Sequence, residues 1–260
     1  MNLSSQKKLI LGAVALTLLA AAGVYFLVAG GASRRRSRAA AENGLGVTLV
    51  EQGKFADAIG HYTEALRIEP GYAEAENNLG VALVRSGQAN SALDHYQAAL
   101  KLKPDFAEAE NNLGNALVQT AAVQDALAHY QKALQIKPDY AEAHADLGVA
   151  LVRLNRIAEA IAEDQQALAL SPNDVQVHIN LANALYRNGR PHDAADQYEA
   201  ALKLKPDLAE AQNNLGILLA QDGKMKEAIP HFQAAVRIDP GFTEAKNNLS
   251  IAQQQAGSGQ

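Results

Sequence analysis

The chain has 260 residues, a formal net charge of −5 and no cysteine. Without cysteine it has no disulfides, thiolate zinc sites or covalent c-type haem attachment. Residues 1–38 carry six of the 23 Lys and Arg residues and none of the 28 Asp and Glu residues, which leaves residues 39–260 with a net charge of −11. This acidic portion argues against nucleic acid as a partner, because nucleic-acid binding needs a basic stripe.

The first predicted element is an apolar segment, residues 9–32, between a short basic tail (1–8) and a basic linker (33–38). It contains no charged side chain, and Thr17 is its one polar residue. At about 1.5 Å per residue, a helix of this length crosses a hydrocarbon core of about 30 Å. A cleaved signal peptide is the alternative, but the apolar region of a signal peptide usually has only about 7–15 residues. We therefore predict a single retained transmembrane helix.

Basic residues flank this segment on both sides. Two lysines precede it, and four arginines follow it: Lys7, Lys8, Arg34, Arg35, Arg36 and Arg38. The positive-inside rule favours a cytoplasmic location for the rest of the chain, and a periplasmic location stays open because the difference is small. The alanine-rich composition and the anchor indicate a bacterial inner membrane. Small residues spaced by four within the segment would let it pack against other transmembrane helices.

A strict period of 34 residues runs through the rest of the chain. It is marked by Pro70, Pro104, Pro138, Pro172, Pro206 and Pro240. A period of this size indicates a stack of repeated units, a solenoid, whose function usually resides on one long surface. With the proline as position 32, the units are 39–72, 73–106, 107–140, 141–174, 175–208 and 209–242.

Each unit has the pattern of two short amphipathic helices. Apolar or small residues recur at positions 3, 7, 10 and 11 and again at positions 20, 21, 24, 27 and 28, and both sets lie on one face of a helix. Position 7 is always Leu, position 8 is Gly in five units, and position 24 is aromatic except at Asp164. A buried carboxylate is costly unless it is paired. Unit four therefore either packs loosely or is functionally distinct.

Turn residues fit the same frame. Position 15, where we expect the first helix to end, is glycine in four units, Asn155 in one and the less suitable Ala121 in another. After the proline, position 33 is Asp or Asn in four units, and these residues are expected to cap the next helix. They are Asp105, Asp139, Asn173 and Asp207.

This pattern resembles the tetratricopeptide repeat (TPR) family, which has Leu-Gly at positions 7–8, Ala at 20 and 27, an aromatic residue at 24 and Pro at 32. The resemblance covers residues 39–256 and departs from the family at position 4, where Glu, His or Gln replaces a large aromatic residue. It implies an all-α fold, a right-handed TPR superhelix (α-solenoid), preceded here by the transmembrane helix. Residues 243–256 repeat only the first helix, and we interpret them as a C-terminal capping helix before a flexible tail, 257–260.

The resemblance implies that positions 2, 5, 6, 9, 12 and 13 of each first helix line a concave face. Side-chain amides recur at positions 5, 6 and 9: Asn77, Asn78, Asn111, Asn112, Asn115, Asn180, Asn183, Asn213, Asn214, Asn247 and Asn248. An Asn amide both donates and accepts hydrogen bonds. Such a column can therefore grip the backbone of an extended peptide; ordinary family background at these positions is the alternative and stays open.

Two other kinds of site are disfavoured. A carboxylate clamp for chaperone C-terminal tails needs Lys and Arg at positions 2, 5, 6 and 9, where this chain has none. Histidine recurs at position 23 in four units, but helices in adjacent repeats lie at least about 8–10 Å apart, too far to share one ion. These residues are His61, His95, His129 and His231. We predict no metal site and no cofactor.

The sequence contains no phosphate-binding glycine loop, metal-ligand cluster or nucleophile motif. We therefore predict a non-enzymatic, membrane-anchored scaffold that binds or recruits protein partners through its concave face, such as an assembly factor. The alternative is a constitutive structural subunit of a larger membrane complex, with the transmembrane helix packed against other subunits.

Overall fold

The computed structural model describes residues 31–258 and contains helices but no strand in that range. The predicted tail 1–8 lies outside the described residues, and so does the predicted membrane segment 9–32 except for its last two residues. None of the helices within 31–258 is both long enough and apolar enough to cross a bilayer.

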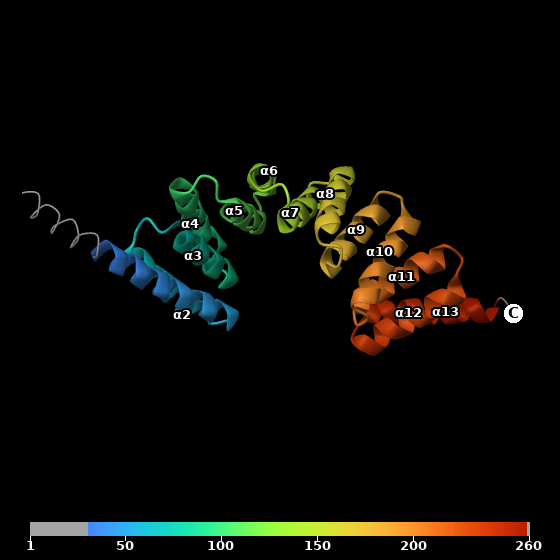
Figure 1. Ribbon diagram of the computed structural model, residues 1–260. Helices are drawn as coiled ribbons and strands as arrows, with labels where there is room; N and C mark the ends of the chain where they lie inside the picture. Colours follow the sequence, from blue (N-terminus) through green and yellow to red (C-terminus); the bar gives the residue numbers. More distant parts are fainter. Residues whose placement is uncertain (1–30, 259–260) are drawn as a thin grey trace, which may run out of the picture. The chain divides into compact units, whose positions relative to one another are not determined.

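The chain divides into two compact units, residues 1–104 and 105–260. The described part of the first unit holds helical residues 31–51, followed by α2 (Phe55–Ile68), α3 (Ala73–Arg85) and α4 (Ala89–Leu102). The second unit continues the series, as Figure 1 shows. Its helices are α5 (Ala107–Gln119), α6 (Val123–Ile136), α7 (Ala141–Arg153), α8 (Ile157–Leu170), α9 (Val175–Arg187), α10 (Pro191–Leu204), α11 (Ala209–Gln221), α12 (Met225–Ile238) and α13 (Thr243–Ser258).

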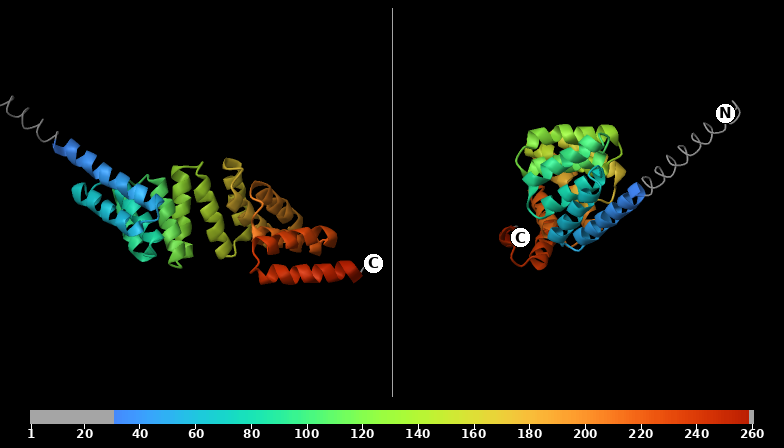
Figure 2. Two further views of the ribbon diagram at one scale, coloured as in Figure 1. Left: turned by 90° about the horizontal axis from the view of Figure 1, so that it is seen from below. Right: turned by 90° about the vertical axis from the view of Figure 1, so that its left-hand side faces the viewer.

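Within the second unit, the helices pack as consecutive hairpins. Each first helix contacts the second helix of its own repeat, as in α5 with α6 and α7 with α8. First helices of successive repeats also contact each other: α5 contacts α7, and α7 contacts α9. The last helix, α13, contacts both α11 and α12 and lies beside α12 in Figure 2. The apolar stripes of the sequence therefore face one another within and between repeats.

The ring at position 24 packs against the small residue at position 8 of the same repeat. Tyr130 is buried, and a Cβ atom added to Gly114 would lie 2.7 Å from its ring. Phe232 and Gly216 repeat this contact with the same 2.7 Å approach. Because real Cβ atoms do not come so close, the glycine is what lets the two helices approach with a large ring between them.

The turn between the two helices of a repeat is left-handed at position 15, as the sequence predicts. The backbone φ is +74° at Gly53, +83° at Gly87, +74° at Gly189 and +77° at Gly223. Asn155 and Ala121 adopt the same conformation, with φ of +59° and +65°. Asn tolerates this region, whereas the Cβ of alanine makes it unfavourable.

The predicted helix caps at position 33 are wrong. The helices begin one residue later, so that position 34 is the N-cap, as at Tyr72, Phe106 and Tyr140. The carbonyl of Tyr72, for example, accepts from the amides of Ala75 at 3.0 Å and Glu76 at 3.1 Å. An aromatic side chain cannot accept from the first turn. Asp174, the acidic residue at this position, does accept there, from Gln176 N at 2.9 Å and Val177 N at 3.1 Å.

Candidate functional site

The position 5 asparagines lie between neighbouring first helices rather than on the open surface. Asn111 is 0% exposed and Asn213 is 1% exposed, and Asn77 is also buried. In contrast, Asn247, in the last described helix, is exposed. Buried amides of this kind need hydrogen-bond partners inside the protein.

The position 6 asparagines supply those partners from the next repeat. Asn78 donates through Nδ2 to Asn43 Oδ1 at 2.9 Å, and Asn248 donates in the same way to Asn213 Oδ1 at 2.9 Å. Asn213 Nδ2 in turn donates to Glu244 Oε1 at 3.2 Å. These bonds tie successive first helices together, so part of the asparagine column stabilises the stack itself.

Repeat four breaks this arrangement because Asp146 replaces the asparagine at position 6. Asp146 Oδ2 accepts from Asn111 Nδ2 at 2.8 Å and from Asn115 Nδ2 at 2.7 Å. An ionised carboxylate cannot donate, and Asn111 Oδ1 is left buried without a hydrogen-bond partner among residues 31–258. Burial raises the pKa of Asp146, while the two amide donors act in the opposite direction.

Asparagine at position 9 is matched to tyrosine at position 24. Tyr130 Oη donates to Asn115 Oδ1 at 2.6 Å, and Tyr198 Oη donates to Asn183 Oδ1. Asn214 Nδ2 also donates to Tyr198 Oη, at 3.1 Å. These bonds satisfy tyrosine hydroxyls at the ends of buried rings.

The predicted site residues therefore fall into two groups. Those at position 5 are enclosed except for Asn247, whereas those at positions 6 and 9 reach the open side of the first helices. Asn78, Asn112, Asn115, Asn180, Asn214 and Asn248 are half-buried, and Asn183 is exposed. We call the side formed by positions 2, 6, 9, 12 and 13 of the first helices the first-helix face.

Two adjoining hollows lie on the first-helix face of repeats four and five. The larger, of about 640 Å³, is bordered by four acidic residues, Asp139, Glu142, Asp146 and Asp174. The smaller, of about 230 Å³, is lined by Val149, Val152, Arg153, Asp164, Asn180 and Asn183. Val149 and Asn180 line both hollows, so the two lie next to each other. Burial and the neighbouring Asp146 raise the pKa of Glu142.

Asp164 forms part of the smaller hollow at the place where other repeats carry a ring. Its side chain is 0% exposed, and neither carboxyl oxygen has a hydrogen-bond partner in the described chain. Burial, with a smaller contribution from the charge of Glu163, raises the pKa of Asp164 from its ordinary 3.8 to about 7. The sequence predicted an irregularity at this residue. In the structure the irregularity is a buried carboxyl whose oxygens have no hydrogen-bond partner among the described residues.

Each repeat also has a polar clasp between its two helices, which was not predicted from the sequence. A histidine at position 4 or 23 lies against a Glu or Gln at the other position, with Nδ1 to oxygen distances of 2.7 or 2.8 Å. The pairs are His61–Glu42, His95–Glu76, His129–Glu110, His144–Glu163, His178–Gln197 and His231–Gln212. The histidine changes helix in repeats four and five, and that compensated exchange is the signal by which the sequence could have revealed the pair.

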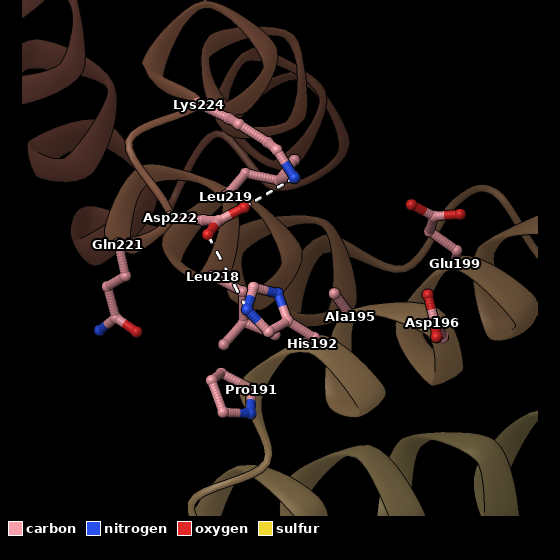
Figure 3. A pocket seen from close by; sticks show the side chains of 10 residues that line it. All are labelled: Pro191, His192, Ala195, Asp196, Glu199, Leu218, Leu219, Gln221, Asp222 and Lys224. Atoms are coloured by element: carbon pink, nitrogen blue, oxygen red, sulfur yellow. Dashed lines mark ion pairs between the residues drawn. The ribbon is translucent and has the colours of Figure 1, made fainter.

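Another pocket, of about 360 Å³, lies between α10 and the end of α11 (Figure 3). Asp222 pairs there with Lys224 Nζ at 2.6 Å, and its other oxygen is 4.0 Å from His192 Nε2. Asp196 and Glu199 stand apart from this cluster in Figure 3. The lining has no Ser, Thr or Cys that could act as a nucleophile. Within residues 31–258, no three His, Cys, Asp or Glu side chains are grouped to hold a metal ion.

Comparison with known families gives three matching models. One, described as "Tetratricopeptide repeat", matches residues 13–73, 43–105, 77–141 and 179–241. Another with the same description matches residues 121–163, and one described as "TPR repeat" matches residues 150–189. None of the curated proteins matches the chain.

Several solved structures share the fold. YrrB, described as a TPR protein with an unusual peptide-binding site, is 25% identical, with a TM-score of 0.61 over 72% of this chain and 96% of its own. PilF of Pseudomonas aeruginosa is 22% identical, with a TM-score of 0.75 over 85% of this chain and 99% of its own. TTC0263 of Thermus thermophilus is 24% identical, with a TM-score of 0.59 over 70% of this chain and 99% of its own. The last two show the fold alone.

Proposed function

We propose that this chain, which belongs to the tetratricopeptide repeat family, is a membrane-anchored scaffold. In this proposal it binds an extended segment of a protein partner on its first-helix face. The observation that carries this proposal is the pair of adjoining hollows on repeats four and five, with Asn180 on the wall of both. The amides of Asn180 and Asn183 offer donors and acceptors to a peptide backbone beside apolar walls. The peptide-binding site named for YrrB supports the same use of this fold.

The membrane part of the proposal depends on the sequence. Residues 9–32 are uncharged, and basic residues flank them on both sides. We propose that they span a bacterial inner membrane and leave the repeats in the cytoplasm, with the periplasm as the alternative. The basic linker 33–38 would then lie beside anionic lipid headgroups.

A second candidate function is that of a constitutive subunit of a membrane complex, in which a neighbouring subunit fills the first-helix face. Extraction in mild detergent followed by native size analysis separates the two. A recruiting scaffold should run mostly alone, whereas a constitutive subunit should co-migrate with fixed stoichiometry. Neither candidate assigns a catalytic reaction to the chain.

Partner capture tests the binding surface directly. The full chain in detergent should capture a partner that the Asn180→Ala/Asn183→Ala variant captures at least about tenfold less, the equivalent of about 1.4 kcal/mol. The matched control is Asn90→Ala/Gln97→Ala on α4, where both side chains are exposed on a second helix. Equal capture by the two variants, with both folded by circular dichroism, would remove the first-helix face from the proposal.

The anchor has its own test. Carbonate-washed membranes should retain the full chain, and protease added to sealed inverted vesicles should digest the repeats if they face the cytoplasm. Release of the intact chain by carbonate would contradict the anchor. Protection of the repeats in inverted vesicles would favour the periplasmic alternative.

A further inference from the structure

Repeat four differs from its neighbours in what occupies the ring position. In repeat three, Tyr130 fills the space above Gly114. In repeat four, the atom nearest to a Cβ placed on Gly148 would be Asp164 Oδ1, so the carboxyl sits where the ring would be. A carboxyl is much smaller than a phenol ring, and the hollow of about 230 Å³ lies at this place.

This hollow combines an apolar wall with a buried acid. Val149 and Val152 line it, and Asp164 lies within it with both oxygens unpartnered in the described residues. A buried carboxyl without a partner is unfavourable, and the ionised form is more so. A ligand that brings a positive charge and donors would relieve both penalties.

The charges around the hollow favour a cation. The adjoining larger hollow is bordered by Asp139, Glu142, Asp146 and Asp174, with Lys137 as the basic residue of the same border. Arg153, on the wall of the smaller hollow, directs a guanidinium nitrogen to Val118 O at 3.5 Å.

The nearby basic side chains also contact the protein itself, and one of them, Lys137, lines the larger hollow. Arg187 reaches Val152 O at 3.5 Å and Asn155 Oδ1 at 3.1 Å. Lys137 lies 4.6 Å from the ring centroid of Tyr140. The four acidic side chains outnumber Lys137 and Arg153, the two basic side chains that line the hollows, so an approaching segment meets a net negative charge.

We infer that Asp164 is the base of a pocket that receives one long cationic side chain, lysine or arginine, from the extended segment bound on the first-helix face. The methylene stem would lie along Val149 and Val152. Because Asp164 is 0% exposed, the side chains that cover it would have to move aside before the charged head could donate to the carboxylate. This inference rests on the proposed peptide-binding function and adds the chemistry of the ligand. An aromatic side chain would fill the space but leave the carboxyl unpaired.

A peptide-display experiment tests the pocket. A random dodecapeptide library is selected on the full chain in detergent, and the enriched peptides are synthesised with each lysine or arginine kept or replaced by methionine. We expect the enriched set to share a basic residue. Replacement of that residue by methionine should weaken binding to the wild-type chain by about tenfold or more. The same replacement should change binding to Asp164→Asn by less than about twofold, which is the signature of a direct pairing in a double-mutant cycle.

Two further variants keep the test decisive. Asp164→Phe fills the hollow, and we expect it to bind the basic peptides at least tenfold more weakly while melting at a higher temperature than the wild type, so that loss of binding cannot be attributed to unfolding. Asp125→Asn, at an exposed carboxylate on α6, is the matched control and should bind like the wild type.

The outcomes separate the inference from the function on which it rests. Peptides that bind without any basic preference would overturn the pocket and leave the scaffold intact. A basic preference that survives Asp164→Asn but is lost in Glu142→Gln/Asp146→Asn would assign it to the larger hollow and also overturn the inference. Failure of every peptide to bind, together with a partner whose capture is insensitive to Asn180 and Asn183, would contradict both.

Discussion

Ala121 is held in a left-handed conformation that four other repeats assign to glycine. Its φ of +65° places the Cβ against the backbone, which disfavours the turn after α5. We expect Ala121→Gly to raise the free energy of unfolding by about 1 kcal/mol, the steric relief being offset in part by the greater freedom of the unfolded chain. Urea denaturation followed by circular dichroism measures this change. Asn155→Gly is the control and should change stability much less, since Asn tolerates the same conformation.

Asp164 makes the stability of the second unit depend on pH. Burial raises its folded-state pKa to about 7, above the 3.8 of the unfolded chain, so the folded state holds the proton more tightly. Its contribution to stability is therefore complete below about pH 4 and is lost as the pH rises through about 7, a change of up to about 4 kcal/mol.

Asp164→Asn isolates this effect. Other carboxyls with raised pKa values, Asp146 and Glu142, contribute in the same direction in both chains. We expect the difference in unfolding free energy between Asp164→Asn and the wild type to grow from about pH 4 and to level off above about pH 7. A difference that does not vary with pH would mean that Asp164 titrates normally in the folded protein.

At the scale of the elements, the bonds between first helices depend on which residue stands at position 6. Asp146 cannot donate to Asn111 Oδ1, which stays buried and unpartnered within residues 31–258. We expect Asp146→Asn to supply the missing donor and raise the free energy of unfolding by about 1 kcal/mol. The reverse substitution, Asn248→Asp, removes the donor to Asn213 Oδ1 and should lower the free energy of unfolding by a similar amount. Thermal melts should therefore show a higher melting temperature for Asp146→Asn and a lower one for Asn248→Asp.

The clasp within each repeat makes a second prediction for helix pairing. His129 Nδ1 on α6 lies 2.7 Å from Glu110 Oε2 on α5, and the glutamate is largely buried. We expect His129→Glu alone to destabilise the protein by about 1–2 kcal/mol, since it places two carboxylates together. The double variant His129→Glu/Glu110→His should recover most of that loss, because repeat four already carries the exchanged pair as His144 and Glu163. No recovery in a double-mutant cycle would show that the clasp depends on orientation.

At the scale of the whole chain, repeat four interrupts an otherwise regular packing. The cavity beside Asp164 and the unpartnered oxygen of Asn111 both weaken the contacts around α7 and α8. In a stack of repeats, stability is a sum of local terms, so a weak repeat opens more readily than its neighbours. We expect backbone amides of α8 to exchange with deuterium about tenfold faster than those of α6 or α10. Asp164→Phe should slow that exchange to the level of its neighbours.

The sequence predicted the architecture well because the repeat period carries it. The 34-residue spacing indicated helix pairs and the TPR family, and the glycines of position 15 marked left-handed turns. The helix starts were misplaced because proximity to proline suggested a cap at Asp105 or Asp139, whereas the chain enters the helix one residue later.

The candidate site was predicted only in outline, because its features depend on contacts between repeats. Asn78 and Asn43 are 35 residues apart, and their hydrogen bond follows from the stacking of first helices rather than from the pattern within one repeat. The hollow at Asp164 likewise depends on α9, which supplies Asn180 and Asn183 to its wall. The sequence marked Asp164 as irregular, but it could not show whether the residue was enclosed or paired.

The exchange of histidine between positions 4 and 23 constrains how such a chain can have been assembled by duplication. A crossover between the two helices of repeats three and four would join Glu110 to Glu163 in one product and His144 to His129 in the other. The first product would set two carboxylates against each other, and the second would set two imidazoles. Segments that end between repeats avoid both mismatches. Wherever repeats of opposite orientation are recombined, a whole helix pair is therefore the smallest unit that can be copied, deleted or grafted without loss of its internal clasp.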